Sequence, residues 1–433
     1  MNKNNLLKIT SELKTFSNND NIIDYKKIKR VLVKIKNKLI ENKKKIVKSI
    51  SLDINKPIHL SEVEFTSSMN IWSYVINNIN LINRNKKYIF SKNKSGKIIY
   101  IPIGLVGFIT PWNYPLLTLS ERLPFCIGAG CTAIIKPSEF SPRFTKILIK
   151  LINNDSTLNK QIRILSNTKP KTGIALCNDT NIDLISFVGS TKTGKKISKQ
   201  CSVSLKKTNL ELGGKNAAIV CKSSKIDFAI SQIINGIFEN GGQACVAISR
   251  VLIDEKIYNI FINKIIFKVE QLIKSNKLKL QLPANYLQSK KIISVIKQIK
   301  SSLPKNALKI FNFKTHKNYS PIFIFSKNKK NFFLDEEFFF PIVSFGKFKN
   351  INECIKLNNS TSYGLASYIF SSNKDEKDQL INNLKCGRIW INSTLEWNPI
   401  LPVGGFNMSG NGRDMGIDGF LLYLSSKSVY INN

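Results

Sequence analysis

Apolar positions along the chain follow two different periods, and the two periods alternate. Between residues 28 and 50, Ile and Leu mostly fall three or four positions apart with lysines between them, which predicts an amphipathic surface helix. Residues 96–109 read as strand material, and residues 116–130 return to a helical pattern. The next run, residues 131–136, is short and apolar, as are strands buried in parallel sheets.

The alternation continues to residue 275 and predicts two series of elements. The first holds a helix at 141–153, strands near 161–165 and 183–188, and a helix from Ser190; the second holds a strand at 217–221 and helices near 226–239 and 256–275. Strands that alternate with helices predict a doubly wound α/β fold. Residues 276–330 are rich in Lys, Asn and Ser and predict no element.

The composition is that of a globular protein. A chain of 433 residues with 42% hydrophobic content can bury a large core and should divide into two or three domains. The most apolar stretch, residues 98–112, is too short for a membrane span and is interrupted by Pro102, Gly104 and Gly107. The N-terminus shows no secretory signal and the eight cysteines form no CxxC pair, so we expect a cytoplasmic protein without a disulfide framework or a metal site.

A formal net charge of +38 raises the question of nucleic-acid binding. The lysines, however, are spread over nearly every segment, together with abundant Asn and Ile, and form no focused basic stripe. We therefore expect weak, salt-sensitive adhesion to polyanions and no specific nucleic-acid site.

One cysteine stands in a setting suited to nucleophilic chemistry. In the stretch 238–245, Phe-Glu-Asn-Gly-Gly-Gln-Ala-Cys, two glycines permit a sharp turn, and Asn240 and Gln243 bring polar groups near the sulfur of Cys245. The chain has two histidines, neither in a motif, so a carboxylate is the better candidate base. Glu211 lies 34 positions upstream (245 minus 211), between two leucines and before a glycine pair, where partial desolvation would raise its pKa.

Four blocks in this order resemble the aldehyde dehydrogenase superfamily, over a stretch from about residue 25 to the C-terminus. They are Thr-Pro-Trp-Asn-Tyr-Pro at 110–115, Lys-Pro-Ser-Glu at 136–139, Leu-Glu-Leu-Gly-Gly-Lys at 210–215, and the stretch that ends at Cys245. This chain begins later than typical members, so part of the N-terminal edge of the cofactor domain is expected to be absent.

The resemblance implies a division of the chain into three units. These are a discontinuous NAD-binding domain (1–83 and 104–212), a catalytic domain (213–410), and bridging segments (84–103 and 411–433). In the family the bridging segments join subunits, so a homodimer or homotetramer is expected.

The resemblance also implies the NAD-dependent oxidation of an aldehyde to a carboxylic acid. Cys245 would attack the carbonyl carbon as a thiolate and form a thiohemiacetal, which loses a hydride and becomes a thioester. Glu211 would activate the water that hydrolyses the thioester, and the side-chain amide of Asn113 would donate to the oxyanion beside the backbone N–H of Cys245. Taken singly, each residue also has an ordinary explanation: a packing cysteine, a surface glutamate and a turn asparagine.

No Gly-x-Gly-x-x-Gly follows a strand, so the usual dinucleotide fingerprint is missing. Residues 187–194 match the family's alternative, in which Gly189 permits a close approach and Ser190 begins a helix whose N–H groups can meet pyrophosphate. A carboxylate at Glu139 would accept from a ribose hydroxyl and repel a 2′-phosphate, which favours NAD and leaves NADP as the second candidate. The residues that the resemblance assigns to the cofactor are Trp112, Lys136, Ser138, Glu139, Gly189, Ser190, Glu337 and Phe339.

Three positions depart from the family pattern. Phe340 stands where a glycine is usual, so the loop beside the nicotinamide ribose is expected to be reshaped. Arg122 and Asp414 stand where Lys and Glu are usual, a pair linked with proton movement out of the site. Arginine cannot relay a proton as lysine can, but the longer Arg facing the shorter Asp could preserve the span of an ion pair.

The blocks that look most like the betaine-aldehyde and aminoaldehyde branch are residues 123–125, 129–132, 205–207, 390–392 and 401–405. The first candidate reaction is therefore betaine aldehyde to glycine betaine. The aromatic face of Tyr114 could hold a trimethylammonium group, Glu121 could pair with a cation, and Trp397 either contacts the substrate or packs in its loop. Three alternatives stay open: oxidation of an aminoaldehyde or semialdehyde, acyl transfer to CoA or phosphate, and a decayed, non-catalytic scaffold. Glu211 favours hydrolysis over acyl transfer, and the intact trio of Asn113, Glu211 and Cys245 disfavours decay.

Overall fold

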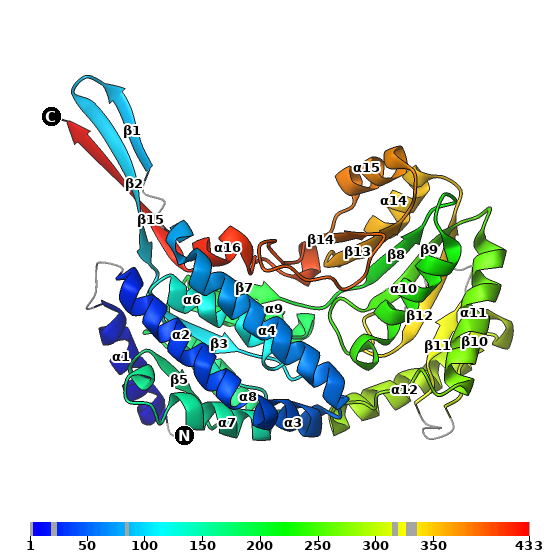
Figure 1. The fold of residues 1–433 in the computed structure, drawn as a ribbon, viewed down its shortest axis with the longest axis horizontal. Coiled ribbons are helices and arrows are strands. Elements are labelled where there is room, and N and C mark those ends of the chain that lie inside the picture. The colour runs from blue at the N-terminus through cyan, green and yellow to red at the C-terminus, as the bar shows by residue number, and fades with distance from the viewer. Residues whose placement is uncertain (1–2, 19–23, 83–85, 314–318, 326–335, 433) are drawn as a thin grey trace.

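The computed structural model describes residues 3–18, 24–82, 86–313, 319–325 and 336–432, and three β-sheets organise this part of the chain. Figure 1 shows two halves side by side, each a sheet covered by helices, and a narrow arm that projects from the first half. The chain crosses from the first half to the second between β7 (Lys207–Glu211) and β8 (Asn216–Val220).

The first sheet has five parallel strands in the order β5-β4-β3-β6-β7. The other strands are β3 (Leu105–Ile109), β4 (Thr132–Lys136), β5 (Ile162–Ile164) and β6 (Leu184–Val188). Successive residues of β3 enter different cores: Val106 and Phe108 pack with helices on one face, Leu105 and Ile109 with helices on the other. Burial on both faces explains the continuous apolar runs, and the doubly wound prediction is confirmed here.

Helices cover both faces of the first sheet. One face carries α2 (Tyr25–Glu41), α3 (Lys43–Ile54), α4 (Ile58–Asn78), α5 (Leu117–Ser120), α6 (Leu123–Gly128) and α7 (Pro142–Ile152), and the other carries α1 (Lys3–Asn18), α8 (Pro170–Asn178) and α9 (Thr191–Ser202). The helical pattern of residues 116–130 corresponds to two short helices, α5 and α6. Pro124, which has no N–H to donate, lies in the first turn of α6.

The single helix predicted for residues 28–50 is wrong, because two helices meet at Asn42. This residue ends α2 and begins α3, and its side-chain amide donates to Lys38 O at 2.9 Å. The apolar face stays continuous across the break, since Leu39 and Ile46 enter the same core. The hydrophobic period alone therefore does not reveal the break.

The second sheet has seven strands in the order β10-β11-β12-β9-β8-β13-β14, all parallel except β10 with β11. Its further strands are β9 (Ile248–Asp254), β10 (Leu308–Ile310), β11 (Ile322–Ile324), β12 (Ile342–Phe348), β13 (Ala366–Phe370) and β14 (Arg388–Ile391). Its helices are α10 (Ile226–Phe238), α11 (Tyr258–Lys274), α12 (Tyr286–Ser302), α14 (Ile351–Asn359) and α15 (Lys374–Asn383), and a 3₁₀ helix, η3 (Glu239–Gly242), follows α10. The region 276–330, which predicts no element, thus contains α12 and two strands.

The arm is an antiparallel sheet in the order β1-β2-β15. β1 (Lys86–Ser91) and β2 (Lys94–Pro102) pair with each other, and the C-terminal strand β15 (Leu424–Asn432) pairs with β2 (Figure 1). The helix before it, α16 (Gly416–Leu421), packs on the first half, where the rings of Phe420 and Phe125 are 4.8 Å apart. The two predicted bridging segments thus meet in one sheet, and their role between subunits stays a prediction.

Within the described ranges, no helix is long and apolar enough to cross a membrane. Nor do three or more His, Cys, Asp or Glu side chains of these ranges come together as a metal site would need. The loops after β3 and β6 leave neighbouring parallel strands at their carboxyl ends, the edge where such sheets bind ligands.

Candidate active site

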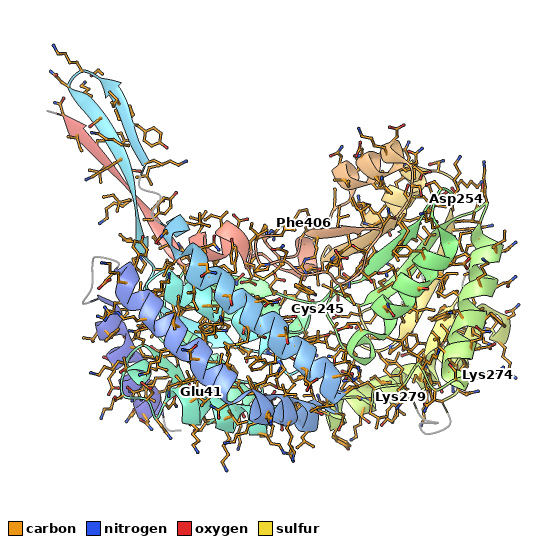
Figure 2. The ribbon with its side chains drawn as sticks, viewed as in Figure 1. Glu41, Cys245, Asp254, Lys274, Lys279 and Phe406 are labelled. Carbon is orange, nitrogen blue, oxygen red and sulfur yellow. The ribbon has the colours of Figure 1, made fainter. Side chains whose placement is uncertain are left out.

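A cavity of about 350 Å³ is lined by residues of both halves. Its walls come from α4, from the loops after β3 and β6, from η3 and from the loop after β14. Figure 2 shows Cys245 in the middle of the molecule, between the helices of the first half and those of the second. The predicted site residues that line the cavity are Trp112, Asn113, Tyr114, Glu121, Gly189, Ser190, Cys245, Glu337, Phe339 and Trp397; those that do not are Lys136, Ser138, Glu139 and Glu211.

Cys245 follows a turn that requires glycine. Asn240 and the two glycines after it have φ of 48°, 66° and 73°, in the left-handed region. A Cβ at Gly242 would also lie 2.7 Å from the backbone of Phe340, so no side chain fits there. The carbonyl of Cys245 accepts from Asn216 Nδ2 at 2.8 Å, whereas its backbone N–H has no partner in the described part of the chain.

Asn113 lies in the loop after β3 and contacts the turn that carries Cys245. Its Nδ2 donates to Gln243 O at 3.0 Å, two residues before the sulfur. An Asn amide has two N–H donors, and the second has no partner among the described residues. This N–H and the backbone N–H of Cys245 are two donors of the kind that stabilise an oxyanion.

Glu211 ends β7 and is buried in the cavity wall, where Leu212 and Gly213 provide the lining surface. Its Oε1 has no hydrogen-bond partner among the described residues. Burial raises the pKa of this carboxyl to about 8; Asp414 adds to the shift and Arg122 opposes it. A carboxylate with this pKa is suited to accept a proton near neutral pH.

The resting sulfur of Cys245 is a thiol at neutral pH. Burial raises its pKa to about 12, the carboxylates of Glu211, Glu121 and Glu337 add to the shift, and Arg388 opposes it. Among these charges Glu211 has the largest effect, so its carboxyl group lies within electrostatic reach of the sulfur.

Arg122 and Asp414 form a buried ion pair, with 2.5 Å between Nη2 and Oδ2, which confirms that the exchanged residues preserve the pair. Asn209 Nδ2 donates to the other carboxylate oxygen at 2.8 Å, and Arg122 Nη1 donates to Thr118 O at 2.6 Å. Both charges act on the pKa of Glu211. Because the guanidinium does not release its proton, Arg122 is a fixed positive charge that lowers the pKa of Glu211.

Two residues predicted for the cofactor lie at the start of α9. Ser190 is its N-cap and accepts through Oγ from Thr193 N at 3.3 Å. Ser190 and Gly189 line the cavity, so this helix of 12 residues begins at the cavity wall with first-turn N–H groups suited to phosphate. Nearby, the rings of Trp112 and Phe339 meet edge to face at 5.7 Å.

Glu337 is held against the glycine pair at 213–214. Its Oε1 accepts from Gly214 N at 3.2 Å, and a Cβ at Gly213 would lie 2.1 Å from Oε2, so this carboxylate requires the glycine. Burial raises the pKa of Glu337 to about 7. From α12, Gln288 Nε2 donates to the carbonyls of the next two residues, 338 and 339, and fixes the loop.

Phe340 turns away from the cavity into the core of the second sheet. The residue before it, Phe339, has φ of 59°, an uncommon conformation for a bulky side chain. The unusual Phe340 thus lies beside a strained loop residue, while Glu337 and Phe339 still reach the cavity.

Lys136, Ser138 and Glu139 lie apart from the cavity, at the carboxyl end of β4, the strand beside β3. Lys136 Nζ is 3.8 Å from the carboxylate of Glu139, whose side chain is 37% exposed. Ser138 Oγ accepts from Phe140 N at 3.2 Å. Glu139 is therefore open to a ligand that crosses this strand end.

The two aromatic rings predicted to meet a substrate already carry a cation of the protein. Lys56 Nζ is 3.8 Å from the ring centroid of Tyr114, and the guanidinium of Arg388 is 4.0 Å from that of Trp397. Tyr114 OH also donates to Glu239 Oε1 at 2.5 Å. At most one face of each ring remains for a substrate.

Glu121 and Glu239 place two carboxyl groups in the lining. Burial raises the pKa of Glu121. Arg122, which lies 3.4 Å from Oε2, and to a smaller extent Arg388 oppose this shift. The carboxyl groups of Glu121 and Glu239 are both part of the lining and together form an acidic wall of the cavity.

Sequence reasoning missed several residues that line the cavity or support it. They are Lys56, Glu64, Asn216, Glu239, Gln288, Lys291 and Arg388. Glu239 had a signal, since it stands in the block that ends at Cys245. The others are polar or charged residues of helices, strands and loops. In a single sequence they look the same as polar residues that face solvent.

Comparison with known proteins gives consistent matches. A model of the aldehyde dehydrogenase family matches residues 21–429. The betaine aldehyde dehydrogenase of Bacillus subtilis is 30% identical over 415 residues, 93% of this chain and 84% of that protein. The NAD(P)+ aldehyde dehydrogenase 1 of Saccharomyces cerevisiae is 32% identical over 417 residues, 91% and 81% of the two chains. The crystal structure of betaine aldehyde dehydrogenase from Staphylococcus aureus in complex with NAD+ superposes with a TM-score of 0.90 at 26% identity, covering 99% of this chain and 87% of that one.

Proposed function

The chain belongs to the aldehyde dehydrogenase family, and from this premise we propose that it oxidises a small aldehyde to a carboxylic acid through Cys245, with NAD as the hydride acceptor. One observation carries the proposal. The thiol of Cys245 and the free amide N–H of Asn113 share a cavity, and the buried carboxyl of Glu211 lies within electrostatic reach of the sulfur.

The residues around the cavity fit a dinucleotide. The start of α9 offers N–H groups for pyrophosphate, Glu337 offers a carboxylate for ribose hydroxyls, and Gly213 leaves the space in which that carboxylate lies. Glu139, beside Lys136, can accept from the other ribose and would repel a 2′-phosphate, which supports NAD over NADP. When bound, NAD supplies the acceptor for a hydride.

The proposed chemistry begins on Cys245. Its sulfur bonds to the aldehyde carbon, and the thiol proton ends on the carbonyl oxygen of the resulting thiohemiacetal. The free N–H of Asn113 and the backbone N–H of Cys245 donate to that oxygen as negative charge develops on it. Loss of hydride from the carbon and of the proton from the oxygen leaves a thioester on Cys245.

Hydrolysis of the thioester needs a base. The carboxylate of Glu211 takes a proton from water, the hydroxide oxygen bonds to the thioester carbon, and the carbon–sulfur bond breaks. The carboxylic acid leaves, and the sulfur regains a proton. In this proposal Glu211 serves the second half of the reaction only.

A pH dependence follows from the pKa of Glu211. Because burial raises that pKa to about 8, the base is mostly protonated at lower pH and must ionise to act. Where hydrolysis limits turnover, we expect kcat to rise by about tenfold per pH unit below 8 and to level off above it. Steady-state NADH formation at saturating aldehyde between pH 6 and 9.5 measures this, and a profile already flat at pH 6.5 would remove Glu211 as the limiting base.

For the substrate, we propose a small cationic aldehyde, with betaine aldehyde as the first candidate. Similarity to the Bacillus subtilis enzyme supports it, and so does the acidic wall formed by Glu121 and Glu239. The cations over Tyr114 and Trp397 favour an alternative within this class. An aminoaldehyde carries an ammonium group that donates hydrogen bonds to carboxylates, which a trimethylammonium group cannot.

The charge of Glu121 gives a test of this substrate class. Glu121→Gln is expected to raise KM for betaine aldehyde or an aminoaldehyde by about tenfold, because a charged partner is lost, and to leave KM for propionaldehyde within about twofold. Glu255→Gln serves as the matched control. Glu255 is exposed and follows the carboxyl end of β9, whereas Cys245 precedes the amino end of this strand. An equal change for charged and neutral aldehydes would remove Glu121 from substrate recognition.

We also propose that the arm joins copies of the chain into a homodimer or homotetramer. Its side chains Ile89, Phe90 and Tyr430 are 78%, 58% and 82% exposed. Large apolar side chains exposed together on a short arm are typical of a surface that contacts another protein chain.

The decisive experiment for the activity is an aldehyde panel with NAD. Acid formation is measured with purified protein in the presence and absence of CoA and phosphate. Acid and NADH in equal amounts, independent of CoA and phosphate, support hydrolysis. No NADH from any aldehyde would favour the decayed scaffold.

A further inference from the structure

A buried ion pair lies at the cavity wall, where Glu64 of α4 is one of the lining residues. Lys56 follows α3, Glu64 lies on α4, and Lys56 Nζ is 2.5 Å from Glu64 Oε2 with both side chains 0% exposed. The reaction proposed above uses neither charge. Both residues nevertheless reach the segment that carries Asn113.

Both members of the pair form hydrogen bonds with this segment. Lys56 has three N–H donors: one goes to Glu64, one goes to Asn113 O at 2.9 Å, and the ring of Tyr114 lies 3.8 Å from the nitrogen. The other oxygen of Glu64 accepts from the backbone N–H groups of residues 116 and 117, at 3.0 and 3.2 Å.

These bonds hold residues 113–117 from both ends. Pro115, in the middle, has no N–H to donate. The carbonyl of Tyr114 accepts from Thr118 N at 3.0 Å and from its Oγ1 at 2.7 Å, whereas the carbonyl of Asn113 depends on Lys56 and on the turn before Cys245. Asn240 Nδ2, from the turn before Cys245, donates to the same carbonyl of Asn113 at 3.2 Å. The backbone that carries the Asn113 amide is thus tied to α4 on one side and to the nucleophile's turn on the other.

Stability alone is a poor reason for a pair of this kind. The cost of removing two charges from water often exceeds their attraction, and apolar residues of the same volume are commonly as stable. Apolar residues could not, however, hold one carbonyl and two N–H groups at fixed points. The pair does so within hydrogen-bonding distance of the Asn113 backbone.

We propose that Lys56 and Glu64 are positioning residues, which fix the backbone at Asn113 and so direct its free side-chain N–H to the carbonyl oxygen of the aldehyde. The inference rests on the proposed function, since it requires Asn113 as an oxyanion donor. It adds to that function two residues that take no part in the proposed chemical steps.

A double-mutant cycle tests the proposal. Lys56→Met and Glu64→Gln are introduced together, so that no buried charge is left unpaired, in the wild-type and in the Asn113→Ala background. If the pair acts through Asn113, kcat/KM falls about 30-fold in the first background and less than about twofold in the second. A merely structural role would give the same loss in both.

Lys14→Met is the matched control. It removes another ion pair of the first half, in which Lys14 Nζ and Asp183 Oδ2 are 2.5 Å apart, before the amino end of β6. It should change kcat/KM less than about twofold in either background. Lys56→Arg keeps a charge beside Glu64 and covers the case in which the paired variant does not fold; a loss of about fivefold that vanishes with Asn113→Ala is expected.

The outcomes separate the two proposals. An active wild type whose Lys56/Glu64 and Asn113 effects multiply overturns the positioning role and leaves the proposed function intact. A wild type that oxidises no aldehyde overturns both.

Discussion

Aldehyde-dependent NADH formation is expected to disappear when Cys245 is replaced by alanine, with kcat falling by at least about 10⁴-fold. Among the eight cysteines, Cys245 is the one that lines the cavity, and the other seven are buried. Without its sulfur the aldehyde carbon cannot form the tetrahedral adduct from which the hydride leaves. The measurement is NADH formation over hours at high enzyme concentration, with the best aldehyde of the panel.

Cys354→Ala provides the matched comparison. Cys354 is fully buried in the second half, away from the cavity, and its replacement should lower the free energy of unfolding by about 1 kcal/mol and leave kcat unchanged. If Cys245→Ala and Cys354→Ala formed NADH at the same rate, covalent catalysis by Cys245 would have to be abandoned.

The first sheet could be predicted from sequence because its strands are buried on both faces. Most positions of strands such as β3 and β4 are then apolar, although β4 also buries Thr132 and Lys136, and that pattern needs no tertiary information. α12 shows the opposite case. Its buried residues Ile292, Ile296 and Ile299 recur at helical spacing, but the lysines and polar residues around them dilute the pattern.

The chemical groups of the site could be predicted because they lie in contiguous blocks. Cys245 and Asn113 line one cavity and Glu211 is buried beside it, an arrangement that no local pattern indicates, and their catalytic roles stay predictions. The ion pair of Lys56 and Glu64 could not be foreseen, since its meaning depends on contact with residue 113, which is remote in sequence. Likewise, only the fold brings Lys56 over Tyr114 and Arg388 over Trp397.

The cations of Lys56 and Arg388 affect which substrates the cavity can bind. Open aromatic faces are what commonly binds a quaternary ammonium group, and the rings of Tyr114 and Trp397 each have one face covered by a cation of the protein. The carboxyl groups of Glu121 and Glu239 remain available. For the cationic substrate class that we propose, recognition would therefore depend more on charge and hydrogen bonding than on aromatic stacking.

Glu211→Gln is expected to separate the two halves of the reaction. The first turnover should give a burst of NADH at least as fast as in the wild type, because the Glu211 carboxylate raises the pKa of the Cys245 thiol and glutamine removes that charge. Steady-state turnover should fall by about 10³-fold, because only hydrolysis of the thioester needs the base. Rapid-mixing measurement of the burst, followed by the steady state, gives both rates.

The stability of this variant gives an independent check on the same carboxyl group. The folded-state pKa of Glu211 is about 8, against an ordinary value of 4.5, so the unfolded chain ionises first as pH rises. The wild type therefore loses stability between pH 4.5 and about 8, and the non-titrating glutamine does not. Urea unfolding is measured at pH 5 and at pH 8.5. The free energy of unfolding of Glu211→Gln relative to that of the wild type should be higher at pH 8.5 than at pH 5. A constant difference would mean that Glu211 is not desolvated.

The burst decides where Glu211 acts. A variant that loses burst and turnover together, yet unfolds as expected, would mean that the carboxylate is needed before the thioester exists. The first step would then require a base for the thiol proton, and Glu211, the charge with the largest effect on that thiol, would be the group in reach. Hydrolysis would pass to Glu337, whose pKa of about 7 also suits a base and whose side chain lines the cavity. A burst without turnover would instead mean that Cys245 and Asn113 carry the thiol addition without Glu211, and that Glu211 activates the water for hydrolysis.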